Sequence, residues 1–256
     1  MIDLTNTLFP VQEVPIEMEG IVNPESYKFI VRSDTSEIIS CMTNEYKLVS
    51  NDSIIETANP ILKDCNAKLT ECKTFGNGAR TMWTWTIPDV SVDVGNGDMV
   101  NPTITLKNSY DGSLQLHILA GAFRIVCSNG LVIGTTISNK MNKHSIHNVN
   151  LDKLEESITD TINTVEDVFV NDFPILTGTE IKPKYTKELI EMFPSFTMEA
   201  LTQYLLTNKP KTFWDLLNAA TWVATHNMKR NYETTHKLES KIYPKITKWA
   251  NEVASA

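Results

Sequence analysis

In this 256-residue chain, the clearest indication of the fold class is the segment Phe75-Gly-Asn-Gly-Ala-Arg-Thr-Met-Trp-Thr-Trp-Thr-Ile87. Its Gly-Asn-Gly centre is typical of a tight β-hairpin turn, because glycine and asparagine adopt the backbone angles that such turns need. The residues that follow alternate in character. We expect Thr81, Trp83 and Trp85 on one strand face and Arg80 on the other. The pattern predicts a hairpin within an antiparallel sheet.

Strand patterns continue on both sides of this hairpin. Upstream, residues 27–32, 38–42 and 46–49 are rich in β-forming residues and separated by short polar turns, which predicts a β-meander. A helix is expected next, over residues 54–62, with Asn51 or Ser53 as its N-cap. Downstream, Asp111-Gly112 lies between apolar strand patterns at 103–107 and 113–117, which predicts a second hairpin.

From residue 151 the apolar residues recur at helical spacing. They predict a long helix over 151–169 that ends before Pro174, and shorter helices at 186–193 and 197–206. Thr212 is expected to cap the next helix, and a last helix over 238–253 contains Pro244. Strands followed by helices are typical of α+β proteins. We therefore predict a twisted antiparallel sheet, made of N-terminal and middle strands, packed with C-terminal helices.

One compact domain with three regions is expected: an acidic N-terminal segment over 1–20, an antiparallel β-rich region over 21–137, and a helical region over 138–256. Charge is uneven along them. Residues 1–60 hold ten acidic and three basic side chains, a net charge of −7, whereas the whole chain carries −8. Phosphate affinity comes from lysine and arginine, so this charge disfavours non-specific nucleic-acid binding but allows a local basic groove.

Several functional classes lack their sequence patterns. The N-terminus has no signal-peptide pattern, and no apolar run reaches the about 20 residues of a membrane span, so we expect no membrane association. The four cysteines have no paired spacing, which favours reduced thiols. Phosphate-binding loops, dinucleotide fingerprints and common hydrolase motifs are absent. We expect no cofactor and no metal, and we favour a non-enzymatic protein while leaving enzymatic activity open.

Three blocks of sequence resemble the phage- and plasmid-borne family of unknown function DUF932. The first runs from Tyr27 to Glu37 and from Asn44 to Asn51, the second covers 108–113 and 123–131, and the third covers 213–221 with His226. The residues that carry the resemblance are Arg32, Asp34, Tyr46, Asn108, Asp111, Gly112, Arg124, Cys127, Asn129, Gly130, Trp214, Asn218, Thr221 and His226.

The resemblance implies a mobile-element origin and the cytoplasm of a bacterial host. It supplies no established activity. The acidic N-terminal segment has no counterpart that we can place in the family.

Single-stranded nucleic acid is bound by basic grooves with aromatic platforms. The candidate binding residues are Arg80, Lys107, Arg124, Lys140, Lys143 and His144, which lie in sequence near Trp83, Trp85, Tyr110 and Phe123. The two tryptophans suit a core equally well. Our leading hypothesis is a non-enzymatic phage or plasmid protein that handles DNA in replication or recombination. It would bind or anneal single-stranded DNA as a homo-oligomer.

Two other hypotheses stay open. The acidic N-terminal region favours a module that binds a host protein and antagonises a host defence or regulator, because an acidic surface docks to basic proteins. An enzyme would use Cys127 as a nucleophile and His226 as its base. A zinc site with Cys127, His144, His147 and His226 is disfavoured, because Cys127 has no neighbouring cysteine.

Overall fold

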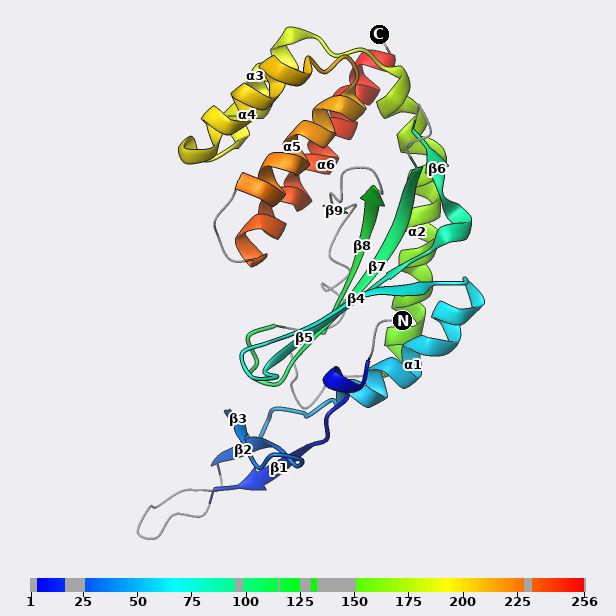
Figure 1. Ribbon diagram of the computed structural model, residues 1–256. Coiled ribbons are helices and arrows are strands. Elements are labelled where there is room, and N and C mark those ends of the chain that lie inside the picture. The colour runs from blue at the N-terminus through cyan, green and yellow to red at the C-terminus, as the bar shows by residue number, and fades with distance from the viewer. Residues whose placement is uncertain are drawn as a thin grey trace. The chain divides into compact units, whose positions relative to one another are not determined.

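The computed structural model describes residues 4–16, 26–94, 99–114, 116–124, 130–132, 151–227 and 232–255 (Figure 1). Strands β1 to β9 precede residue 133, and five of the α-helices follow residue 150. The predicted α+β class, an antiparallel sheet with C-terminal helices, is therefore confirmed. The predicted boundary between the β-rich and helical regions, at residues 137 and 138, lies outside the described residues.

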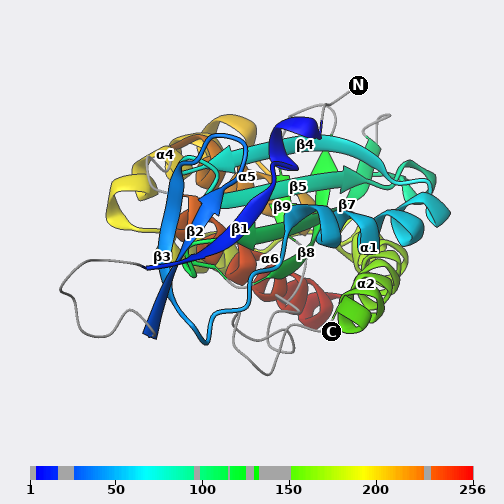
Figure 2. The ribbon, with the colours of Figure 1, turned by 90° about the horizontal axis from the view of Figure 1, so that it is seen from below.

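A three-stranded antiparallel sheet follows the short 3-10 helix η1 (Thr5–Thr7). Its order is β1 (Val11–Pro15), β2 (Tyr27–Arg32), β3 (Ile38–Thr43) (Figure 2). The first two predicted strands are confirmed, but the third, at 46–49, is wrong. The chain turns at once after β3, where the amide of Tyr46 donates to the carbonyl of Thr43 at 3.0 Å. The remaining strand of this sheet is β1, which comes from the acidic N-terminal segment.

Helix α1 (Asn51–Asp64) begins earlier than the apolar pattern indicated. Its N-cap is Ser50, whose Oγ accepts the backbone N–H of Ser53 at 3.1 Å. The predicted caps, Asn51 and Ser53, are therefore the first and third residues of the helix. The helix continues past Pro60 to Asp64, and Leu62 in this last turn is buried.

The larger antiparallel sheet has the order β4-β5-β7-β8-β9, with β6 paired to β7. Its strands are β4 (Lys68–Phe75), β5 (Arg80–Thr86), β6 (Val92–Asp93), β7 (Met99–Ser109), β8 (His117–Arg124) and β9 (Gly130–Val132). A 3-10 helix, η3 (Pro88–Val90), lies between β5 and β6. The predicted β4–β5 hairpin is confirmed, with positive φ at Gly76, Asn77 and Gly78. The second predicted hairpin joins β7 and β8.

The chain divides into two compact units. Unit 1 comprises Met1–Asp89, Ile104–Leu119 and Thr136–Ile162, and unit 2 comprises Val90–Thr103, Ala120–Thr135 and Asn163–Ala256. The chain passes between the units within β7, β8 and helix α2 (Leu151–Gly178). The predicted end of this helix before Pro174 is wrong. The last turn stays helical because Phe173 and Leu176 are buried in the core of unit 2.

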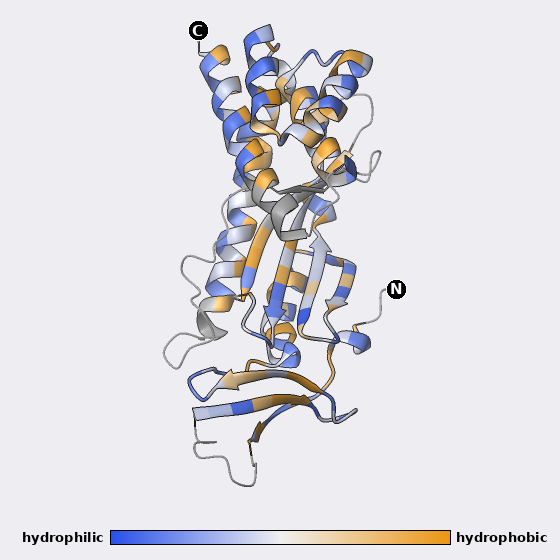
Figure 3. Ribbon diagram, turned by 90° about the vertical axis from the view of Figure 1, so that its left-hand side faces the viewer, coloured by the Kyte–Doolittle hydropathy of each residue, from blue (hydrophilic) through white to orange (hydrophobic). Residues whose placement is uncertain are grey.

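Four further helices complete unit 2: α3 (Pro183–Met192), α4 (Ser195–Asn208), α5 (Phe213–Asn227) and α6 (Tyr232–Ala254). Helices α5 and α6 pack on each other and on β9. Each helix combines polar and apolar residues (Figure 3), and the apolar ones form a core rich in rings: Phe169, Phe173, Tyr185, Phe213, Trp214 and Trp249. No described helix has both the length and the apolar character needed to cross a membrane.

Candidate nucleic-acid interface

The β4–β5 hairpin gives the larger sheet a buried face. Along β5, Thr81, Trp83 and Trp85 are at most 4% exposed, and the indole nitrogen of Trp83 donates to Thr7 Oγ1 at 2.9 Å. The alternation predicted for this strand is therefore confirmed. The two tryptophans and Tyr110, which is 1% exposed, are core residues and offer no platform on which a base could stack.

The opposite face carries two of the predicted basic residues. Thr84 of β5 lies 3.0 Å from Thr105 of β7, measured between the two Oγ1 atoms, so both side chains point to this face. Because side chains alternate along a strand, Arg80 shares the face with Thr84, and Lys107 shares it with Thr105. We call the set Arg80, Thr84, Thr86, Thr105 and Lys107, together with His117 of β8, on which the charge of Lys107 acts, the sheet polar face. The buried, apolar Met82 lies on the same face between Arg80 and Thr84.

The two basic side chains of the sheet polar face are partly or fully buried. Lys107 is only 7% exposed, whereas Arg80 is half-buried at the start of β5. Burial, assisted by the charge of Lys107, lowers the pKa of His117 below its ordinary value of 6.5. At neutral pH this imidazole therefore adds a hydrogen-bonding group rather than a further positive charge.

An exposed aromatic ring borders this face. Phe75, the last residue of β4, lies opposite Arg80 in the strand register and is 41% exposed. Lys73 is two residues earlier on the same side of β4 and forms an ion pair with Glu71. A ring beside a guanidinium can stack on a base while the cation contacts a phosphate. In the sequence Phe75 stands out only as a flank of the turn, although an aromatic residue at a hairpin end is a usable signal of a binding surface.

No described contact links the remaining predicted binding residues to the sheet polar face. Lys140, Lys143 and His144 lie outside the described residues, as do Cys127, Asn129 and His147. Of Arg124 the structure describes the backbone, which ends β8, and Gly130 begins β9 opposite Phe123. The Cys127–His226 hypothesis therefore stays a hypothesis. Among the described residues, no group of three histidine, cysteine or acidic side chains suits a metal ion.

The first two resemblance blocks are hydrogen-bonded to each other. The hydroxyl of Tyr46 donates to the carbonyl of Ser109 at 3.0 Å, and the backbone N–H of Asn51 donates to the hydroxyl of Tyr110 at 2.8 Å. The side chain of Asn108 donates to that of Asn51 at 2.9 Å. Burial raises the pKa of both phenols, so both stay neutral at physiological pH. These residues connect the small sheet, α1 and β7, which is a structural role.

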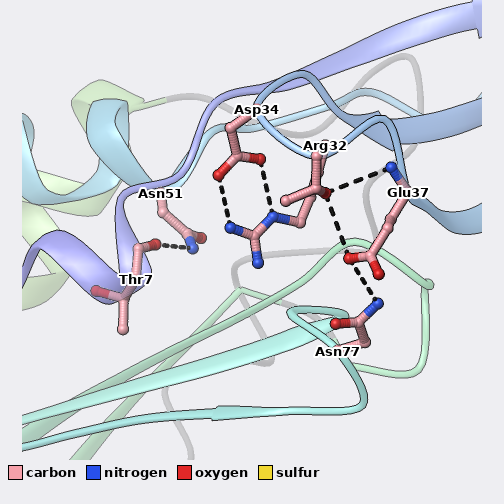
Figure 4. A network of polar contacts seen from close by, with 7 residues as sticks. Thr7, Arg32, Asp34, Glu37, Asn51 and Asn77 are labelled. Carbon is pink, nitrogen blue, oxygen red and sulfur yellow. Dashed lines mark hydrogen bonds and ion pairs between the residues drawn. The ribbon is translucent and has the colours of Figure 1, made fainter.

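Arg32 and Asp34 form a two-bond ion pair at the end of β2. Arg32 Nε lies 3.0 Å from Asp34 Oδ1, and a terminal guanidinium nitrogen lies 2.7 Å from Oδ2 (Figure 4). Hydrogen bonding to Arg32 lowers the pKa of Asp34. The guanidinium also lies 4.0 Å from the centre of the Phe9 ring. The pair therefore fixes the turn after β2 against the N-terminal segment.

Asp111 and Gly112 shape the turn between β7 and β8. Asp111 Oδ1 accepts the backbone N–H of Ser113 at 2.9 Å, which is an Asx turn. Gly112 has φ +68°, and a Cβ there would lie 2.9 Å from the terminal methyl carbon of Met42. Only glycine fits this position without a shift of its neighbour.

The third resemblance block lies on α5 in unit 2. Trp214 is 5% exposed, and the side chains of Asn218 and Thr221 donate to carbonyls within the same helix. The ring of the exposed His226 stacks on that of Trp222, with 5.0 Å between the ring centroids. The described contacts of this block are those of a packed helix.

Comparison with known families agrees with the resemblance blocks from Asn44 onward, whereas the segment Tyr27–Glu37 precedes the matched residues. The sequence profile of DUF932, a domain of unknown function, matches residues 38–242. The chain belongs to the DUF932 family. No curated protein and no solved structure gives a detectable match. The described DUF932 residues that carried the resemblance are thus mostly parts of turns, of a helix and of a buried hydrogen-bond network.

Proposed function

We propose that this DUF932 protein binds single-stranded DNA on the sheet polar face, as a step in DNA replication or recombination of a mobile element and without catalysing a reaction. The observation that carries the proposal is that Arg80 and Lys107 share one sheet face, bordered by the exposed ring of Phe75.

The residue types suit a flexible, negatively charged strand. The planar guanidinium of Arg80 can contact two oxygens of one phosphate, and the threonine hydroxyls can donate to phosphate oxygens. Phe75 can stack on any base, which makes binding tolerant of sequence. The buried ammonium of Lys107 adds positive potential behind them. The acidic remainder of the chain would confine DNA to this face.

The test is fluorescence anisotropy of a labelled single-stranded oligonucleotide, titrated with protein at low and at physiological salt. Saturable binding that weakens with salt is expected. Arg80→Ala removes one phosphate contact and should reduce the slope of log affinity against log salt by about 0.7. Phe75→Ala should cost about 1–3 kcal/mol of binding free energy through lost stacking.

Two control variants remove a positive charge and an aromatic ring from helices outside the sheet polar face. Lys187→Ala removes an exposed charge on α3, and Phe196→Ala removes a ring on α4 that is 51% exposed. Both should bind like the parent protein. Absence of saturable binding at low salt, or equal losses in the control variants, would refute the proposal. Annealing of two complementary strands is then measured with the same variants.

A further inference from the structure

The outer strands of the two sheets differ in how they are protected. Natural edge strands carry charges or proline, which prevent another strand from pairing with them. Edge strand β1 has Glu13 and Pro15, and edge strand β4 has Lys68, Glu71 and Lys73. Edge strand β3, Ile38-Ile-Ser-Cys-Met-Thr43, has neither a charge nor a proline. Figure 2 shows β3 at the border of the small sheet.

The hydrogen bonds of β3 show which of its backbone groups point outward. The N–H of Asn44 donates to the carbonyl of Ser26 at 3.1 Å. Asn44 and Ser26 flank the Tyr27–Thr43 pair, so Tyr27 and Thr43 form a non-hydrogen-bonded pair of the ladder. Hydrogen-bonded pairs alternate along an antiparallel ladder. The register therefore turns the N–H and C=O of Cys41, which lies opposite Phe29, away from β2. No described strand pairs with this side of β3.

Apolar side chains and a groove accompany this edge. Ile38 is 58% exposed at the start of β3, and Tyr27 is 50% exposed opposite its end. The end of the strand borders a surface groove of about 340 Å³, lined by Ser26, Tyr27, Thr43, Asn44 and Glu45. A side chain of an added strand could enter this groove while its backbone pairs with β3.

Carboxylates flank the edge at both ends. Glu37 immediately precedes β3, and Glu45 follows it by two residues; both side chains are exposed. Asn77 holds the Glu37 carboxylate at 3.1 Å, which fixes its position (Figure 4). The surrounding segment, residues 1–60, has ten acidic and three basic side chains. An uncharged edge between two acids favours a partner with an apolar centre and basic ends.

We propose that β3 is a docking edge for an extended segment of a basic protein, which adds to the small sheet as a further antiparallel strand. Backbone hydrogen bonds to Cys41 hold the segment, and its lysine or arginine residues lie opposite Glu37 and Glu45. This site uses a different sheet from the proposed DNA-binding face. Its failure would leave the DNA proposal untouched.

The probe is a fluorescein-labelled peptide of about nine residues, the length that spans Glu37 to Glu45, with alternating valine and threonine and a lysine at each end. Anisotropy of this peptide is measured with the full chain. Saturable binding is expected, and the same peptide with glutamate ends should not bind. Glu37→Gln combined with Glu45→Gln should weaken binding of the lysine peptide, and added salt should do the same.

The edge itself is tested at Cys41. Cys41→Pro removes the outward N–H and should weaken peptide binding by about tenfold or more. Cys41→Ser keeps the N–H and should bind like the parent protein. Thr43→Lys places on the edge a positive charge that repels the lysines of the peptide. It is a second blocking variant that needs no change of backbone. Circular dichroism and the denaturation midpoint establish that each variant is folded.

Three results would overturn the proposal. The first is no binding of the lysine peptide to the folded parent protein. The second is binding that is unchanged in folded Cys41→Pro and Thr43→Lys. The third is a dimer, seen by light scattering, that dissociates in these two variants, because the edge would then belong to a second copy of the chain.

Discussion

Asn108 on β7 donates a 2.9 Å hydrogen bond from its side-chain nitrogen to the side-chain oxygen of Asn51, and each side chain is 1% exposed. Asn51 in turn donates to the carbonyl of Thr7 at 2.6 Å and to Thr81 Oγ1 at 3.1 Å. One buried amide pair therefore connects the N-terminal segment, the first turn of α1 and two strands of the larger sheet. Buried amides with partners on several segments fix the relative positions of those segments.

Replacing Asn108 by alanine should destabilise unit 1. The change leaves Asn51 Oδ1 and the carbonyl of Val49 without a donor in a buried site, which costs about 1–3 kcal/mol for each unsatisfied group. Urea denaturation measures the loss. In the double variant Asn51→Ala/Asn108→Ala, the loss should be smaller than the sum of the single losses, because the shared bond is removed only once. Strict additivity would show that the pair is not coupled.

Gly78→Ala should be strongly destabilising. Gly78 has φ +88°, and a Cβ there would lie 2.6 Å from Cζ of Phe9. Strain of this backbone conformation and the contact with the ring together should cost about 2 kcal/mol or more. Thermal denaturation followed by circular dichroism measures the effect.

Gly178→Ala is the matched control. Gly178 is the last residue of α2, and a Cβ there meets nothing within 4 Å. Alanine should be neutral or stabilise by about 0.4–1 kcal/mol, because it reduces the freedom of the unfolded chain. A similar loss in both variants would contradict the special role assigned to Gly78.

His117 should make stability depend on pH on the acidic side. Its pKa is lowered in the folded chain, so below its ordinary value of 6.5 the unfolded chain binds more protons than the folded one. Its contribution to stability is therefore present above that value and is lost as the pH falls through the lowered folded value. Urea midpoints at several pH values are compared for the parent protein and His117→Gln. The variant should lose less stability on acidification, and identical profiles would reject this role.

A capping box begins α5. Thr212 Oγ1 accepts the N–H of Asp215 at 3.2 Å, while Asp215 Oδ2 accepts the N–H groups of Lys211 and Thr212 at 2.9 and 3.1 Å. Thr212→Ala or Asp215→Ala should each cost about 0.5–2 kcal/mol in chemical denaturation. Thr207→Ala, in the exposed last turn of α4, should change stability by less than about 0.5 kcal/mol. Equal effects at both threonines would refute the capping role.

Local sequence patterns were sufficient for most elements of the fold. Alternation along 80–86, the Gly-Asn-Gly turn and Thr212 as a cap depend on neighbours within a few residues, so their structures follow from backbone geometry and short-range hydrogen bonds. The continuation of α2 past Pro174 and the strand β1 could not be predicted from such local patterns. Each is held by burial or pairing with residues remote in the sequence.

For the candidate sites the division is similar. The family, the α+β class and the basic residue types could all be predicted before the structure was known, because each depends on residue identity and order alone. The pairing of strands in three dimensions places Arg80 and Lys107 on one sheet face and buries Trp83 and Trp85 in the core. The same pairing makes β3 an edge strand. The face, the burial and the edge depend on which strands pair, and pairing joins segments whose contact no local pattern encodes.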